Sequence, residues 1–187
     1  DQRAEQIITE AKRLIPNKPI KYVVNTHHHF NHSGGLRAFV AEGATVVTHE
    51  INKPYYEKTF VAPHTLTPDR LATSPKKAAF ETMTEKKVLT DGNHVIELHH
   101  LSGSGHNDGL LVAYLPKEKI LIEADAFNPP AQMATAPPAT VSPYTANLIS
   151  AIDRLKLDFE RVIPIHYPAD SRAVAKAELM RAGGRGN

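Results

Sequence analysis

The chain has 187 residues, no cysteine, a formal net charge of +2, and 41% hydrophobic and 22% charged residues. This length supports one hydrophobic core and is short for two domains, and the weak net charge excludes a strong field directed at nucleic acid or a membrane surface. No apolar run approaches the length of a membrane span, and the first residues lack the apolar region of a signal peptide. We therefore expect neither nucleic acid nor a membrane as a partner, and any metal site must use histidine, aspartate, glutamate or asparagine.

The first two elements are a helix and a strand. Apolar residues at helical spacing predict an amphipathic helix over Gln2–Leu14, and Pro16 and Pro19 separate it from the next element. Ile20–Val24 is a β-branched apolar run, which predicts a buried strand.

Four histidines follow this strand within six residues, at positions 27, 28, 29 and 32. His27 and His29 are two apart, so in an extended segment their side chains point the same way, and His32 lies just past the turn. Burying several imidazole rings without hydrogen-bond partners costs free energy, whereas neutral imidazole is the commonest metal ligand among side chains. The pattern therefore favours metal binding over simple packing. His28 faces the opposite way, and we expect it to support the site or line a pocket.

The segment from 36 to 84 predicts mixed elements that cover the core. These are a short helix over 36–41 closed by Gly43, a strand over 45–48, a helix over 50–60 interrupted near Pro54, and a long loop over 61–79 with a short helix near 69–72. Tyr55, Tyr56 and Phe60 belong either to the core, which we favour, or to a substrate entrance. His49 and His64 are expected on the surface.

The next segment predicts antiparallel strands with polar residues at their ends. It contains a hairpin over 86–98 with an Asp-Gly turn, a glycine-rich turn over 101–109, and strands over 110–115 and 120–123. The turn carries His106, and Asp125 follows the last strand. Asp108 either orients the ring of His106 or caps the turn, Glu123 is expected to face solvent, and a contact of His94, His99 or His100 with the site stays open.

The last part begins with a loop rich in proline, alanine and threonine over 128–143, which either forms a pocket wall that selects the substrate or is a passive crossover. A helix through about Leu155 should follow, then a strand over 161–165 that ends at His166. The pattern closes with a helix over 171–180 and a frayed basic tail over 181–187.

Four segments in order resemble motifs of the metallo-β-lactamase superfamily. His27-His-His-Phe-Asn-His32 resembles the family's His-x-His-x-Asp-His signature, with Asn31 at the position of the aspartate. The segments around His106, Asp125 and His166 resemble those that carry the family's next ligands. The resemblance implies an α+β fold, a four-layer αββα sandwich, over a single domain of residues 1–187.

In this family, strands of the first half of the sandwich precede the first helix, and this sequence has no room for them. We therefore expect the domain to lack its N-terminal strands, so that an apolar face or strand edge is left open. Either a missing N-terminal segment or a second copy of the chain, as a homo-oligomer, would complete the sheet.

The resemblance also implies a metal centre. His27, His29 and His106 would hold a first ion, His32 and His166 a second, and Asp125 both; these ligands suit one or two zinc ions, and iron or manganese as well. Two ions about 3.5–4 Å apart share a water and lower its pKa. The resulting metal-bound hydroxide would attack an ester, thioester, amide or phosphodiester of a small-molecule substrate, and Asp125 and Asn31 are the catalytic candidates.

Asn31 complicates this reading, because an asparagine supplies a neutral carbonyl oxygen where the family has a charged carboxylate. We therefore predict a strong first metal site and a weak or empty second one. The alternative function is a metal-binding or partner-binding domain on the same fold with little or no catalytic activity.

Overall fold

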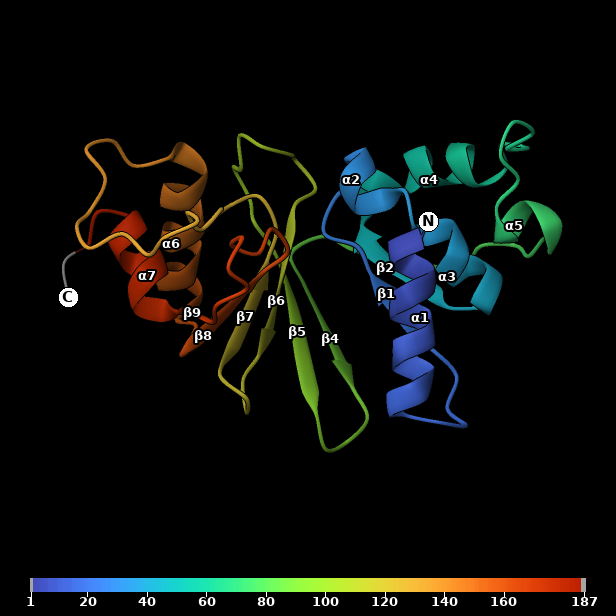
Figure 1. Cartoon of the computed structure of the whole chain (residues 1–187), viewed down its shortest axis with the longest axis horizontal. Coiled ribbons are helices and arrows are strands. Elements are labelled where there is room, and N and C mark those ends of the chain that lie inside the picture. The colour runs from blue at the N-terminus through green and yellow to red at the C-terminus, as the bar shows by residue number, and fades with distance from the viewer. Residues whose placement is uncertain (1, 186–187) are drawn as a thin grey trace. The chain divides into compact units, whose positions relative to one another are not determined.

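The computed structural model of the chain describes residues 2–185 and divides into two compact units, residues up to Thr84 and residues from Glu85. Each unit has one β-sheet and its own helices (Figure 1). No helix among residues 2–185 is both long and apolar enough to cross a lipid bilayer.

The first unit is an α/β unit with a three-stranded parallel sheet in the order β1-β2-β3. Its elements in chain order are α1 (Gln2–Leu14), β1 (Tyr22–Val24), α2 (Phe30–Ser33), α3 (Leu36–Glu42), β2 (Thr45–His49), the 3₁₀ turn η1 (Glu50–Asn52), α4 (Lys53–Phe60), α5 (Arg70–Thr73) and β3 (Phe80–Met83).

The core of the first unit forms where α3 and α4 meet the sheet. Val46 of the central strand is fully buried, and the rings of Tyr56, Phe60 and Phe80 stack with centroids 5.4–6.5 Å apart. Stacked aromatic pairs stabilise a core beyond the area that they bury. Tyr56 and Phe60 are thus core residues, as expected, whereas Tyr55 is 40% exposed.

Helix α1 lies beside α3 (Figure 1). Ala4 and Ile8 of α1 pack on Ala38 of α3. A Cβ atom at Gly35, just before α3, would lie 2.7 Å from the Cβ of Ala4. Only glycine allows this close approach, so the glycine that follows the histidines also fixes α1.

The second unit has a six-stranded sheet in the order β4-β5-β6-β7-β8-β9, antiparallel except for the parallel pair β7–β8. Its elements are β4 (Lys86–Thr90), β5 (Val95–His100), β6 (Leu111–Leu115), β7 (Ile120–Glu123), α6 (Pro143–Leu155), β8 (Arg161–Pro164), β9 (Val174–Ala175) and α7 (Lys176–Ala182).

Helices α6 and α7 pack together with the sheet of the second unit (Figure 1). Leu148 and Ile152 of α6, Leu179 of α7 and Leu121 of β7 are all at most 4% exposed within one apolar cluster. At Gly183, just after α7, an added Cβ would lie 1.9 Å from Cδ1 of Ile149, so the end of α7 lies directly on α6.

Most predicted elements are present, and the differences concern short elements. The structure adds α2, β3 and β9, which the sequence pattern did not indicate. The predicted helix over 171–180 is wrong in its first half, because Val174 pairs with Val162 as a strand and the helix begins at Lys176. Arg181, predicted to lie in a frayed tail, is part of α7; residues 186 and 187 of that tail lie outside the described residues.

Two predicted surface residues are buried. His49 is 8% exposed, and its Nδ1 accepts a hydrogen bond from the backbone N–H of Ile51, 3.3 Å away, at the start of η1. Glu123 is fully buried at the end of β7 and does not face solvent. Burial alternates along β7 and places Glu123 on the same face as the buried Leu121. The prediction took its phase from Ala124, which lies beyond the strand and is buried as well.

Candidate metal centre

The loop after β1 gathers three imidazoles. The ring centroid of His27 lies 4.6 Å from that of His29 and 4.5 Å from that of His32. His29 is the N-cap residue of α2, and the backbone N–H of His32 donates to the carbonyl of His29, 2.9 Å away. This single helical turn, which the sequence pattern missed, returns His32 to the other two rings. Since His27 is fully buried, its imidazole needs a polar partner on the inside.

A buried polar network holds the backbone of this loop. Asn25 is 3% exposed, and its Nδ2 donates to the carbonyl of His32 over 3.2 Å. The hydroxyl of Tyr56 donates to Oδ1 of Asn25 and lies 3.2 Å from the carbonyl of His27. Burial raises the pKa of Tyr56, so its hydroxyl stays protonated as a donor. Sequence reasoning missed Asn25 because a single asparagine after a strand most often marks a turn.

His28 leaves the cluster, as its position in the sequence predicted. Its Nδ1 lies 2.9 Å from Oδ1 of Asn52, and its ring is 5.2 Å from that of Tyr55. Asn52 in turn donates from Nδ2 to Oγ1 of Thr48, 3.2 Å away. His28 therefore ties the histidine loop to η1.

Asn31 lies on α2 and is exposed. Its Nδ2 is 2.8 Å from Nε2 of His32, so Asn31 directly contacts the nitrogen of a predicted ligand.

The second unit gathers a carboxylate and two imidazoles. Nε2 of His106 lies 3.1 Å from Oδ2 of Asp125, and Nε2 of His166 lies 2.8 Å from Oδ1 of the same residue. Register explains the pairing, because Glu123 and Pro164 are partners in the parallel pair β7–β8 and each ligand candidate follows its strand by two residues. The carboxyl ends of parallel strands commonly carry sites.

Glu123 fixes the turn that presents Asp125. Its Oε2 accepts a hydrogen bond from the backbone N–H of Phe127 over 2.9 Å. Burial raises the pKa of Glu123 to about 8 despite this contact and one to the backbone of Ala126. Because Glu123 precedes Asp125 and Phe127 follows it, this hydrogen bond closes the turn around Asp125 and limits where its side chain can lie.

Tyr144 touches the site from α6. Its ring meets that of His106 edge-on, with centroids 5.5 Å apart. No signal in the sequence marked Tyr144, because its position at a helix start has no metal-ligand spacing. The sequence left open whether His94, His99 and His100 contact the site, and the structure gives them other partners. His99 is buried against Glu97, His94 pairs with Asp91, and His100 donates toward the carbonyl of Asp108.

The six predicted ligands thus fall into two sets of three. His27, His29 and His32 lie together in the first unit, and His106, Asp125 and His166 lie together in the second. Within each set, the ligand atoms of His27 and His29, of His106 and Asp125, and of Asp125 and His166 lie within 4.8 Å of one another. Imidazole and carboxylate donors at such spacing fit zinc and similar divalent ions. A metal role for each residue stays a prediction.

Comparison with known proteins identifies the family. A family profile described as "Metallo-beta-lactamase superfamily" matches residues 1–166, which include all six ligand candidates. A metallo-beta-lactamase from Pontibacter korlensis matches with a TM-score of 0.66 and 19% identity, over 96% of this chain and 74% of that one. A rubredoxin oxygen:oxidoreductase from Desulfovibrio gigas matches with a TM-score of 0.66 and 16% identity, over 97% of this chain and 47% of that one.

A third structure, a metallo-beta-lactamase from Hirschia baltica, matches with a TM-score of 0.62 and 17% identity, over 97% of this chain and 74% of that one. Curated proteins gave no match. At these identities the structures establish the fold alone, and they confirm the predicted fold class, α+β and metallo-β-lactamase-like, with two sheets. Together with the profile match they show that this chain belongs to the metallo-beta-lactamase superfamily.

Proposed function

We propose that the protein is a metal-dependent hydrolase. His27, His29 and His106 would hold a first ion, His32 and His166 would hold a second, and Asp125 would contribute to both. The observation that carries the proposal is the position of Asp125, whose two carboxylate oxygens each face a different imidazole at 2.8 and 3.1 Å. A carboxylate placed in this way can share its oxygens between two cations.

The residues of each set can hold their positions before any ion binds. The carbonyls of His27 and His32 contact the buried side chains of Tyr56 and Asn25, and the turn at Asp125 is spanned by Glu123. Groups of this kind that orient metal ligands typically change metal affinity or activity about 10–100-fold when mutated. A divalent ion bound here would lower the pKa of water and polarise a carbonyl or phosphoryl oxygen.

These properties support hydrolysis of an ester, thioester, amide or phosphodiester of a small molecule. Among the residues themselves, Asp125 supplies the negative charge that balances the cations. Tyr144, whose ring meets that of His106, lines a cavity together with Asp125, and this is where the substrate would lie. Zinc is the ion we expect, and iron or manganese would suit the same ligands.

Asn31 should make the affinities of the two proposed metal sites unequal. An asparagine at this position brings no charge to the second ion, and its amide lies against Nε2 of His32. Coordination through that nitrogen requires the contact to break. We therefore expect one tight zinc equivalent per chain and a second at least about 10-fold weaker.

Calorimetric titration of chelator-washed protein with zinc tests the proposal. His27→Ala and His106→Ala should each abolish the tight equivalent, although the two residues belong to different units, and His32→Ala should remove only the weak one. Asn31→Asp should tighten the weak equivalent. The proposal fails if His106→Ala leaves tight binding intact, or if wild-type protein binds two equivalents equally tightly.

The second candidate, a metal-binding or partner-binding domain with little catalysis, is favoured by Asn31 alone. A screen of p-nitrophenyl esters, thioesters, lactams and phosphodiesters with added zinc or manganese separates the two. Turnover that His106→Ala abolishes supports the hydrolase. Tight zinc binding without turnover, also absent from Asn31→Asp, supports the binding domain.

A further inference from the structure

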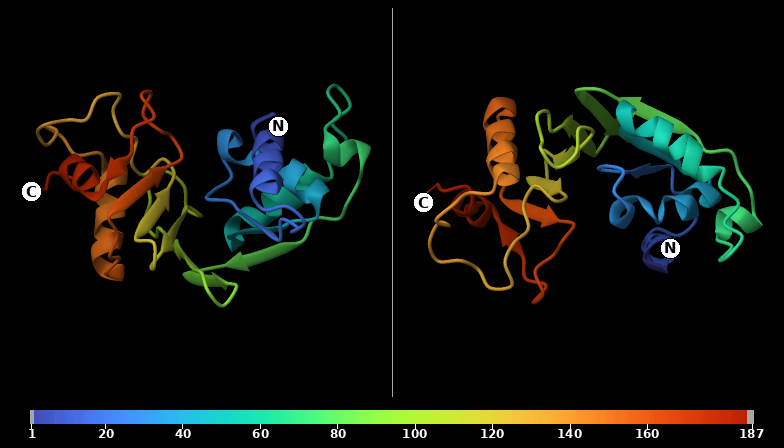
Figure 2. Two further views of the ribbon diagram at one scale, coloured as in Figure 1. Left: turned by 60° about the horizontal axis from the view of Figure 1, so that its bottom comes forward. Right: turned by 90° about the horizontal axis from the view of Figure 1, so that it is seen from above.

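The second unit contains a cavity of about 310 Å³ next to Asp125. Its walls are the loop over 126–142, the start of α6 and the end of α7. Both views in Figure 2 show this loop arching beside α7 before it enters α6. The volume lies at the small end of the range of about 300–1,000 Å³ that is usual for small-molecule pockets.

Apolar atoms make up most of the surface that lines the cavity, although eight of its fifteen lining residues carry a polar or charged group. The loop contributes Pro130, Ala134, Ala136 and Pro138, and α7 contributes Ala182. These side chains offer no hydrogen-bond donor or acceptor, so a hydrocarbon group that enters gains about 0.8 kcal/mol per buried methylene.

The buried carboxylate of Glu178 and two arginines lie near the cavity. Glu178 is 4% exposed and accepts two hydrogen bonds from Arg172, at 2.7 and 2.9 Å. Arg172 also donates to the carbonyl of Pro130, and Arg181 to that of Ala134, each over 2.9 Å. The two guanidinium groups thus tie the loop to the C-terminal part of the unit. The charge of Arg172 offsets that of Glu178, while Arg181, which also lines the cavity, bonds to the backbone of the loop. An ionic ligand group would lose its hydration against the largely apolar surface of the cavity, which costs free energy.

We infer that this cavity takes an uncharged hydrocarbon chain of the substrate, with the scissile bond placed beside Asp125 and Tyr144, which line it. The inference rests on the proposed function and narrows its substrate to esters, thioesters or amides that carry an apolar chain. Either the acyl side or the alcohol side could supply that chain, and the experiment separates the two.

The kinetic experiment varies chain length. With zinc present, kcat/KM for p-nitrophenyl acetate, butyrate, hexanoate and octanoate should rise about fourfold per methylene until the cavity is filled, as expected from about 0.8 kcal/mol each. In a parallel series of methyl, butyl and hexyl acetates, kcat/KM should not change with chain length if the acyl chain enters the cavity. If the alcohol chain enters, kcat/KM should rise in this series and not in the first. A preference for chains with a terminal carboxylate would overturn the inference, as would two flat series.

Ala182→Phe places a ring into the cavity from a helix rather than from the loop. It should flatten the rising series, because the ring fills the volume that longer chains would occupy and so removes their apolar burial. Ala177→Phe is the matched control, because Ala177 is exposed on the same helix and does not line the cavity. Equal chain-length dependence in both variants would contradict the inference.

A binding measurement separates this inference from the proposed function. In backbone amide NMR spectra of the full chain, hexanamide should shift residues of the loop over 128–142 and of α7, while hexanoate and acetamide should not. Ala182→Phe should abolish these shifts. Selective binding of hexanamide without turnover would support the apolar binding site and contradict the hydrolase proposal. Turnover without such binding would support the hydrolase proposal and contradict the apolar binding site.

Discussion

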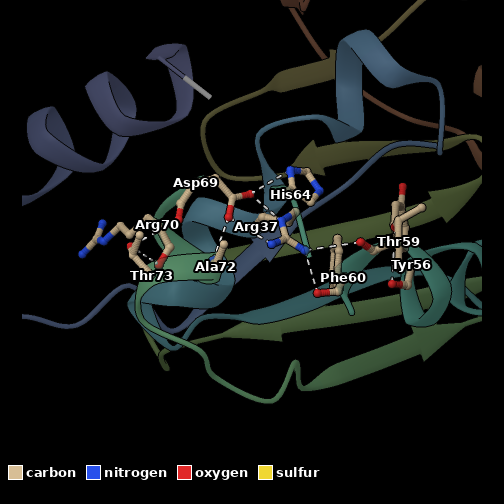
Figure 3. Close-up of polar contacts among 9 residues, drawn as sticks. All are labelled: Arg37, Tyr56, Thr59, Phe60, His64, Asp69, Arg70, Ala72 and Thr73. Carbon is tan, nitrogen blue, oxygen red and sulfur yellow. Dashed lines mark hydrogen bonds and ion pairs between the residues drawn. The ribbon is translucent and has the colours of Figure 1, made fainter. Parts of the chain in front are cut away.

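The ion pair between Arg37 and Asp69 is the clearest place to test the energetics of the first unit. Figure 3 shows Arg37 of α3 between the carboxylate of Asp69 and the last turn of α4. Nη2 of Arg37 donates to Oδ1 of Asp69 over 2.9 Å, Nε donates to Oδ2, and Nη1 donates to the carbonyl of Phe60 over 2.6 Å. Both charged side chains are at most 6% exposed.

Asp69 has a second task. Its Oδ1 accepts a hydrogen bond from the backbone N–H of Ala72 over 2.8 Å, and so caps α5. The guanidinium of Arg37 is the main reason that the pKa of Asp69 falls to about 2, with the Ala72 N–H contributing and burial opposing. His64 lies 3.5 Å away on the exposed side of the carboxylate.

The perturbation is Asp69→Asn, which keeps the shape and the cap but removes the charge. A pKa lowered from 3.8 to about 2 corresponds to about 2.4 kcal/mol of stability from the ionised carboxylate, at about 1.36 kcal/mol per pKa unit. Leaving Arg37 buried without its counter-charge raises the expected loss to about 3–5 kcal/mol. Urea unfolding at pH 7, followed by far-UV circular dichroism, measures the loss.

The dependence on pH provides the control. Because the folded pKa is depressed, this stabilisation is present above the unfolded pKa of about 3.8 and disappears as pH falls through the folded value of about 2. The difference between wild type and Asp69→Asn should therefore be constant from pH 7 to about 5 and shrink below pH 4. A difference under about 1 kcal/mol at pH 7, or one that does not shrink in acid, would refute the reasoning, because a buried pair broken on one side should cost several times more.

Two further substitutions test packing and support of the site. Gly183→Ala should destabilise the second unit by about 1–3 kcal/mol, since its Cβ would lie 1.9 Å from Cδ1 of Ile149. Adding Ile149→Val, which deletes that atom, should recover part of the lost thermal stability. If the losses of the two single variants simply add in the double variant, the two side chains do not clash. Tyr56→Phe removes the donor to Asn25 and should lower the free energy of unfolding by about 1–3 kcal/mol and the affinity for zinc by about 10-fold or more. Tyr55→Phe, at a half-exposed ring, should change neither value. If Tyr56→Phe leaves the zinc affinity unchanged, the network does not orient the histidines.

The sequence could predict the first three ligand candidates because their signal is local. Histidines two apart after an apolar strand are recognisable from spacing alone, and the structure brings His27, His29 and His32 together around one helical turn. His106, Asp125 and His166 are far apart in the chain. Their proximity depends on β7 and β8 being parallel neighbours, which no local pattern encodes, and for these residues the family resemblance was necessary.

The remaining errors share a physical cause. Glu123 was assigned to solvent because Ala124 was expected to point inward, but Ala124 lies beyond the strand, and the alternation within β7 places Glu123 on the buried face, where its carboxyl group accepts from the N–H of Phe127. Strand β9 has only two residues, and it exists because Val174 pairs with Val162 rather than through any preference of its own. Arg181 reads as part of a basic tail until its guanidinium is seen to bind the carbonyl of Ala134. In each case a tertiary contact outweighed the local pattern.

The two ligand sets depend on the same structural device. In each, a buried polar residue at a strand end bonds to the backbone beyond the ligands: Asn25 reaches the carbonyl of His32, and Glu123 reaches the N–H of Phe127. Because an unpaired buried amide or carboxyl group costs roughly 1–3 kcal/mol, conformations of the loop that break these bonds are disfavoured whether or not an ion is bound. The loop after β1 and the turn at Asp125 are therefore ordered by folding itself, and binding of the proposed cations does not have to supply that ordering free energy. Asn31 takes no part in these bonds, so Asn31→Asp should add a charge beside His32 while leaving the backbone intact, and should thereby tighten binding of the proposed second ion.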